Sequence, residues 1–110
     1  MGVLFSVQNK LGNKYQEKHY QRAIAITLKN LGIQFEKKVK IDVPFEKESL
    51  GIFFADFVID GKIILEIKTI PKITINEIKR TLRYLQTTNL HLGIIANFRP
   101  PHLEFKRVVN

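Results

Sequence analysis

Residues 55–68 constrain the fold of this chain more than any other stretch. They form two apolar runs that meet at Asp60-Gly61. Apolar runs of this length are typical of strands buried on at least one face, and Asp-Gly between them is a strong β-hairpin signal. Three charged residues interrupt the runs, Asp56, Glu66 and Lys68. Because an ionised side chain is costly to bury without a partner, the pattern indicates that these groups meet.

The two acids suit a divalent cation. Carboxylate oxygens are preferred ligands of Mg²⁺ and Mn²⁺, and a cation held by Asp56 and Glu66 would offset the cost of burying them. Such a cation would polarise a scissile phosphate and lower the pKa of a bound water, while Lys68 orients that water or balances charge in the transition state. The alternative is a structural ion pair between Asp56 and Lys68, with Glu66 exposed at a strand end.

The loop of the hairpin decides whether the two acids share a face of the sheet. A two-residue turn would pair Asp56 with Leu65 and place Glu66 on the opposite face. A three-residue loop with Gly61 in the left-handed conformation, or a nearby bulge, would bring the acids together. We therefore predict such an irregularity.

The hydrophobic pattern of the rest of the chain predicts an α+β domain with a mixed sheet and two flanking helices. One helix is expected over residues 14–31, ended by Gly32, and another after a capping box at Thr74–Glu77. Strands are expected at residues 34–43 (ended by Pro44), 51–59, 62–69, 90–98 and 103–109, in the order αβββαββ. The length of 110 residues predicts one domain, residues 1–110.

Glu17 is a further candidate for the site. It lies on the extension of a predicted buried stripe formed by Tyr20, Ile24 and Leu28. That position would let it reach the cation through a water. A glutamate in the first turn of a helix is equally explained by its favourable interaction with the helix dipole.

The charge balance indicates a polyanionic partner. Eighteen Lys and Arg against ten Asp and Glu give a formal net charge of +8. A small basic domain attracts nucleic acid, although charge alone is equally compatible with a basic solubilising surface. The residues expected to contact phosphates are Lys14, Lys18, Lys79, Arg80 and Arg83. The lysines at positions 37, 38 and 40 are interpreted instead as a solvated strand edge that discourages aggregation.

Composition also excludes several classes of site. The chain has no cysteine, which rules out disulfides, thiolate zinc sites and cysteine nucleophiles. The apolar residues near its N-terminus are too few for a signal peptide or a membrane span. The sequence therefore favours a cytoplasmic protein with no membrane partner.

The charged residues of the hairpin resemble a known signature. An acidic residue in one strand followed by Glu-x-Lys in the next is the pattern of the PD-(D/E)xK nuclease superfamily, seen here as Asp56 and Glu66-Ile67-Lys68. The resemblance implies a restriction-endonuclease-like core and a divalent-metal site. It also implies the backbone carbonyl of Ile67 as a further metal ligand.

Within that superfamily the chain is most similar to the GxxExxY proteins. The similarity rests on Glu17–Gln21, residues 55–59, 64–68, 84–85 and 92–98, and the terminal residues 106–109. The sequence departs from the family at two positions. Lys14 stands where the family has its first glycine, and Arg80 stands where a glutamine often precedes the helix tyrosine, here Tyr84.

The resemblance implies a nuclease acting on DNA, with junction or branched DNA as a candidate substrate. Small junction-resolving relatives work as dimers, so a homodimer is expected. Two alternatives remain: a nucleic-acid-binding module that keeps the fold without activity, and an accessory protein whose basic face docks on a partner. The joint presence of Asp56, Glu66 and Lys68 favours the enzyme.

Overall fold

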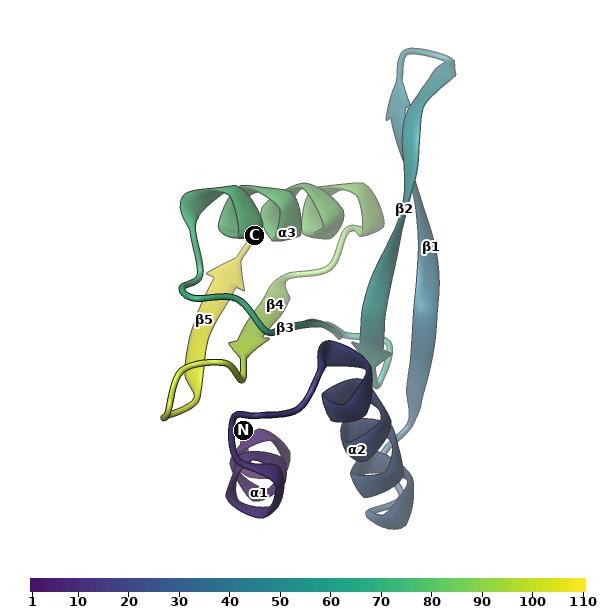
Figure 1. Ribbon diagram of the computed structural model, residues 1–110. Helices are drawn as coiled ribbons and strands as arrows, with labels where there is room; N and C mark the ends of the chain where they lie inside the picture. The colour runs from purple at the N-terminus through teal and green to yellow at the C-terminus, as the bar shows by residue number, and fades with distance from the viewer.

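The computed structural model describes residues 1–110, which form three helices and one five-stranded sheet. The helices are α1 (Gly2–Leu11), α2 (Glu17–Asn30) and α3 (Ile75–Thr88). The strands are β1 (Phe35–Phe45), β2 (Glu48–Ile59), β3 (Ile63–Lys68), β4 (Leu92–Asn97) and β5 (Glu104–Val109). They lie in chain order across the sheet, with β3 and β4 parallel and all other neighbours antiparallel. The predicted α+β class with a mixed sheet is confirmed (Figure 1).

Helices cover both faces of the central part of the sheet (Figure 1). Helices α1 and α2 cover one face, while α3, the crossover between the parallel strands β3 and β4, covers the other. Burial on both sides explains why the sequences of β3 and β4 are almost continuously apolar. Helix α3 lies so close to β4 that a Cβ atom at Gly93 would be 2.7 Å from Cγ2 of Thr81. Glycine at this position therefore permits the close packing of the crossover helix.

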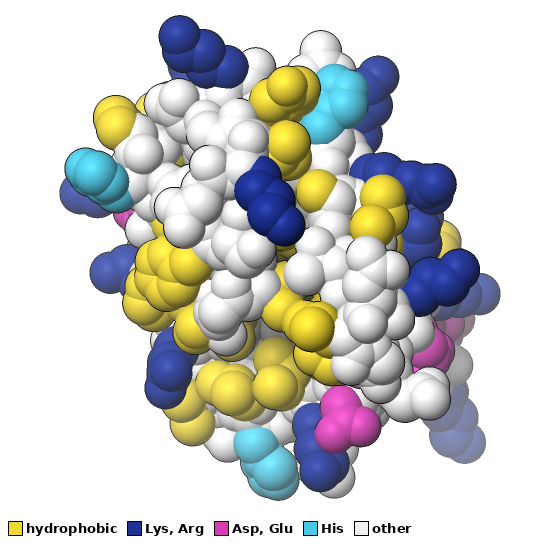
Figure 2. Space-filling view, turned by 90° about the horizontal axis from the view of Figure 1, so that it is seen from below, with side chains coloured by type: hydrophobic (Ala, Val, Ile, Leu, Met, Phe, Trp, Pro, Cys, Tyr) yellow, Lys and Arg dark blue, Asp and Glu magenta, His cyan; other side chains and the backbone are white.

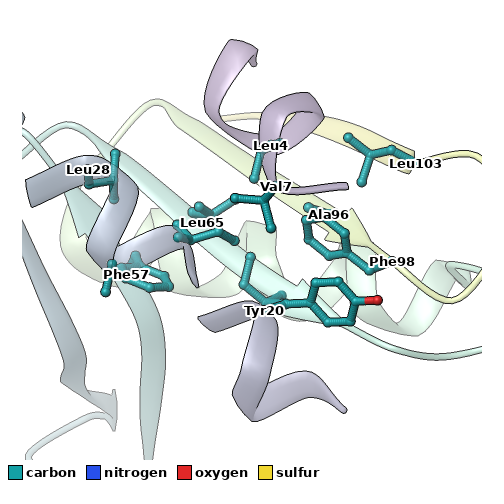
Figure 3. Packing of buried hydrophobic residues seen from close by; sticks show 12 residues of the cluster. Leu4, Val7, Tyr20, Leu28, Phe57, Leu65, Ala96, Phe98 and Leu103 are labelled. Carbon is teal, nitrogen blue, oxygen red and sulfur yellow. The ribbon is translucent and has the colours of Figure 1, made fainter. Parts of the chain in front are cut away.

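Tyr20 anchors α2 to the sheet, as the predicted stripe on this helix required. Its ring is fully buried and stacks on Phe98 with centroids 4.4 Å apart (Figure 3). Its hydroxyl donates a hydrogen bond to the carbonyl of Gly12 at 2.7 Å. The predicted helix begins three residues later than expected, at Glu17, which places this glutamate at the very start of α2.

Helix α1 extends the predicted order to ααβββαββ. Only Leu4 and Val7 of this helix are buried, both in the cluster beneath α1 and α2 (Figure 3). Two buried positions in a short helix give a weak periodic signal, which is why the sequence did not indicate it. None of the helices is long and apolar enough to span a bilayer.

Strands β1 and β2 form a long hairpin that projects beyond the rest of the sheet (Figure 1). Because β2 pairs with β3 only from Phe57 to Ile59, residues 48–56 have β1 as their only neighbouring strand. Pro44 does not end β1, as the sequence predicted, but lies inside it at a register shift after Val43. Proline is tolerated there because β1 is an edge strand and the shift interrupts the hydrogen-bond ladder.

Candidate active site

The loop between β2 and β3 brings Asp56 and Glu66 into register. Regular pairing of the two strands leaves a three-residue loop, residues 60–62, in which Gly61 adopts a φ of 62°. The same register, continued away from the loop, places Asp56 opposite Glu66. The predicted irregularity is thus confirmed, and the two acids come from facing positions of the hairpin.

Asp56 lies where β2 leaves β3. The backbone pairing of the two strands stops at Phe57, and the Oδ2 atom of Asp56 then accepts the N–H of Ile67 at 2.7 Å. The N–H and C=O of one strand residue project to the same edge, so the carbonyl of Ile67 also faces Asp56. A carboxylate and a backbone carbonyl therefore line the gap between the diverging strands.

Glu66 is the most perturbed ionisable group of the site. It is 7% exposed, and its Oε1 atom is buried without a hydrogen-bond partner. Desolvation and then the neighbouring Asp56 carboxylate raise the pKa of Glu66 to about 8, against the opposing effect of the Lys68 ammonium. An orphaned carboxylate oxygen beside a second carboxylate is a donor set that suits a hard divalent cation such as Mg²⁺ or Mn²⁺.

Lys68 does not form the structural ion pair considered as the alternative. The chain has a single ion pair, between Lys62 and Asp60, and Lys68 is not part of it. Glu66 is buried in β3 rather than exposed at a strand end. The charges of the site are thus close but not paired, so the alternative of a structural ion pair between Asp56 and Lys68 is wrong.

Glu17 approaches the same place from the start of α2. Burial raises the pKa of Glu17, Lys68 opposes this, and Asp56 adds to it. Its Oε1 atom accepts a hydrogen bond from Nε2 of Gln21 at 3.4 Å. No group of three or more acidic or histidine side chains is close enough to hold one ion. Glu17 therefore suits a contact through water rather than direct coordination.

Tyr84 reaches the site from α3, on the opposite face from α2. Burial and the charge of Glu66 raise the pKa of Tyr84, whereas Arg80 and Arg83 oppose the rise. Its ring also packs against Phe53, with centroids 5.7 Å apart. The sequence favours a packing role for this tyrosine, with a hydroxyl near the site as the alternative. Arg80, four residues earlier, shares a helix face with Tyr84, but this spacing alone does not show that the face meets Glu66.

The predicted phosphate-contacting residues separate into two groups. Arg80 and Arg83 act on the ionisation of Tyr84, and Lys18 lines a pocket next to Asp56. Lys14 and Lys79 are exposed, and no contact places them at the site. The face seen from below carries dark blue Lys and Arg side chains around much of its edge and few acidic ones (Figure 2).

The buried side-chain amide of Asn97 holds the segment that follows Lys68 in place. Asn97 is fully buried at the end of β4, where its Nδ2 donates to the carbonyl of Ile70 at 2.8 Å and to Oε1 of Glu104 at 2.9 Å. Its Oδ1 accepts the N–H of Ile70 at 3.0 Å, and Glu104 accepts the N–H of Ile73 at 3.0 Å. The sequence did not predict this network, since a polar residue at the end of an apolar strand was its only signal.

Two solved structures share this fold. The protein SSO0001 aligns with a TM-score of 0.64 at 18% identity, covering 84% of this chain and 49% of its own. An alkaline exonuclease (LHK-Exo) from Laribacter hongkongensis aligns with a TM-score of 0.59 at 15% identity, covering 84% of this chain and 54% of its own. The chain thus spans about half the length of each, and identities this low show a common fold alone.

Sequence comparison gives the family. No curated protein matches the chain significantly. The profile of the PD-(D/E)XK nuclease superfamily, however, matches residues 1–108, nearly the whole sequence. The match includes the hairpin in which Asp56 faces Glu66 and the Lys68 that follows. The chain therefore belongs to the PD-(D/E)XK nuclease superfamily.

Proposed function

We propose that this chain is a divalent-metal-dependent nuclease that hydrolyses phosphodiester bonds in DNA, including junction or branched DNA. The observation that carries the proposal is the buried, unpartnered Oε1 of Glu66 in register with Asp56. Membership of the nuclease superfamily and the net charge of +8 support it. We further propose that residues 1–110 act as one nuclease domain.

Each residue of the site has its own role in the proposed hydrolysis. Asp56, Glu66 and the carbonyl of Ile67 would hold the cation, which when bound supplies Lewis acidity at a phosphate oxygen. Lys68 orients the attacking water and offsets the negative charge that builds up on the phosphate in the transition state. Glu17 holds a water of the same site. The oxygen of water bonds to phosphorus and gives up a proton to solvent, the bond to the leaving sugar oxygen breaks, and that oxygen takes up a proton from solvent.

Binding of the substrate is assigned to the basic surface. Lys18, Arg80 and Arg83 lie around the site, and Lys14 and Lys79 would contact phosphates farther along the strand. These are phosphate-binding side chains without an evident set of base-reading groups. We therefore propose recognition of the shape of the nucleic acid rather than of its sequence.

We also assign the chain to the GxxExxY family within the superfamily. The tyrosine of the motif is Tyr20, which is buried against Phe98 and fixes the orientation of α2. Glu17 lies three residues earlier, close to one helical turn, where the anchored helix directs it toward Lys68. The motif thus couples a packing residue to a site residue.

Removal of the metal tests the proposed activity. The protein is expected to cleave plasmid, single-stranded or four-way-junction DNA in Mg²⁺ or Mn²⁺, to lose this activity in EDTA, and to regain it with excess Mg²⁺. Gel electrophoresis of each substrate, with RNA in parallel, measures it. Cleavage that persists in EDTA would contradict metal dependence. Binding without cleavage under every condition would favour the inactive binding module instead.

The projecting hairpin supports the further proposal of a homodimer. Leu50, Ile52 and Phe54 lie at alternate positions on one face of it and are 66%, 50% and 58% exposed. On the paired strand Lys40 is opposite Phe54 and Asp42 is opposite Ile52. A second copy packed antiparallel on this face would cover the apolar side chains and set each Lys40 near the partner's Asp42.

Substitutions on the hairpin test the dimer. Phe54→Ser is expected to raise the dimer dissociation constant at least about tenfold, measured by analytical ultracentrifugation, since it removes apolar area from the interface. Ile75→Ser, which changes an equally exposed residue of α3, is the matched control. Lys40→Glu should weaken the dimer, and Lys40→Glu combined with Asp42→Lys should restore it. A wild-type protein that stays monomeric at high concentration would exclude the dimer.

A further inference from the structure

A basic pocket opens beside Asp56, between α2 and β1. Its volume is about 200 Å³, and four of its seven lining residues are cations, Lys18 and Arg22 from α2 and Lys37 and Lys38 from β1. Asp56 forms part of its wall. One carboxylate is thus shared between this pocket and the site that contains Glu66.

None of these four cations has an acidic partner in the protein. The single ion pair of the chain, Lys62 with Asp60 at 3.8 Å, lies elsewhere, in the hairpin loop. Four positive charges around one pocket repel one another, and a bound anion would relieve that repulsion. In the sequence alone Lys37 and Lys38 are interpreted as part of a solvated strand edge, whereas their place in this pocket points to a ligand.

The backbone of β1 is distorted in a way that directs both lysines to the pocket. Neighbouring residues of a regular strand project to opposite faces, yet Lys37 and Lys38 both line the pocket. Lys38 has a φ of 52°, which is uncommon for a residue with a side chain, and the pairing of β1 with β2 skips Lys38 opposite Asp56. Strained backbone of this kind tends to occur at functional sites, where it is part of the mechanism.

At the same distortion, alternate residues of β2 stop facing the same helix. Ala55 packs in the cluster beneath α3, whereas Phe57, two residues later, packs in the cluster beneath α1 and α2. The hairpin therefore twists at Lys38 and Asp56, so that each of its faces meets a different helix on either side of these residues. This rotation brings the start of β1 alongside α2 and forms the pocket.

We propose that this pocket binds a phosphate group of the nucleic acid next to the one that is cleaved. The inference deepens the proposed nuclease function and rests on it. Arg22 offers a planar guanidinium suited to two phosphate oxygens, and the lysines supply point charges. Because Asp56 belongs to both places, one strand would present one phosphate to the pocket and the next to Asp56 and Glu66. The phosphate is either an internal phosphodiester or a terminal phosphate.

Binding measured without cleavage tests the pocket. The probes are fluorescent single-stranded oligonucleotides with a 5′-phosphate, a 3′-phosphate or no terminal phosphate, followed by fluorescence anisotropy in EDTA over a salt series. Arg22→Gln combined with Lys38→Gly is expected to weaken binding at least about tenfold at low salt and to reduce the salt slope by about one unit or more. Glycine tolerates the positive φ, so Lys38→Gly should not unfold the protein. Lys29→Gln combined with Lys106→Gln, two exposed cations away from the pocket, is the control.

The two sources of phosphate give different results. If the pocket takes a terminal phosphate, removing that phosphate should weaken wild-type binding as much as the double substitution does. If it takes an internal one, all three probes should bind alike and lose affinity equally in the variant. Wild-type or control-like binding by the Arg22→Gln and Lys38→Gly variant would overturn the proposal, even if the protein cleaves DNA. A selective loss of binding in a protein that does not cleave would support the pocket and refute the nuclease.

Discussion

Replacing Lys68 with methionine is expected to slow metal-dependent cleavage by about 100- to 10,000-fold, the range typical of removing a positioned proton-transfer or charge-stabilising group. Methionine keeps most of the apolar stem but removes the ammonium whose charge acts on both Glu17 and Glu66. Single-turnover rates at saturating protein measure the effect on the chemical step rather than on binding.

Lys62→Met is the matched control for this prediction. Lys62 lies in the loop of the same hairpin, and its side chain is 78% exposed, so its loss should leave the rate within about twofold. A fall of less than about tenfold for Lys68→Met, or an equal fall for Lys62→Met, would show that Lys68 has no part in catalysis.

The second large effect concerns the stability of the metal-free protein. The pKa of Glu66 is about 8 when folded and 4.5 in the absence of its surroundings. At a pH between these two pKa values, Glu66 keeps its proton in the folded state but has lost it in the unfolded state. The free energy of unfolding should therefore fall as the pH rises from about 5 to 8. Glu17, whose pKa is also raised, acts in the same direction. The expected loss is about 2–4 kcal/mol.

Urea denaturation in EDTA at pH 5 and pH 8 measures this loss. Glu66→Gln removes the titrating group while keeping its size, so it should match the wild type at pH 5 and exceed it in stability at pH 8. Excess Mg²⁺ at pH 8 should stabilise the wild type by about 2.7 kcal/mol at 100 times the dissociation constant and leave Glu66→Gln unchanged. Parallel pH profiles for the two proteins would refute the assigned pKa of Glu66.

The sequence predicted the hairpin because its determinants are local. The Asp60-Gly61 turn, the apolar runs and the requirement that Asp56 and Glu66 share a face were sufficient to predict a three-residue loop or a nearby bulge, and the structure has the three-residue loop. The capping box of α3 was equally local, and Glu77 accepts the N–H of Thr74 at 2.7 Å.

The missed features depend on contacts between distant segments. Tyr84 belongs to the site only because α3 crosses the sheet above Glu66, and no spacing within α3 alone shows this. The pocket next to Asp56 likewise requires α2 and β1 to lie side by side and Lys38 to adopt a positive φ. In the sequence, lysines of a ligand pocket and lysines of a solvated edge look the same.

Asp56 also has a structural role, separate from its proposed role in hydrolysis. Its carboxylate replaces the missing backbone partner of Ile67 at the fork between two strands. An alanine at this position would open the fork as well as remove a charge, so an inactive Asp56→Ala protein says little about chemistry. Asparagine keeps an acceptor for the same N–H, which makes it the substitution that separates architecture from reactivity in this enzyme family.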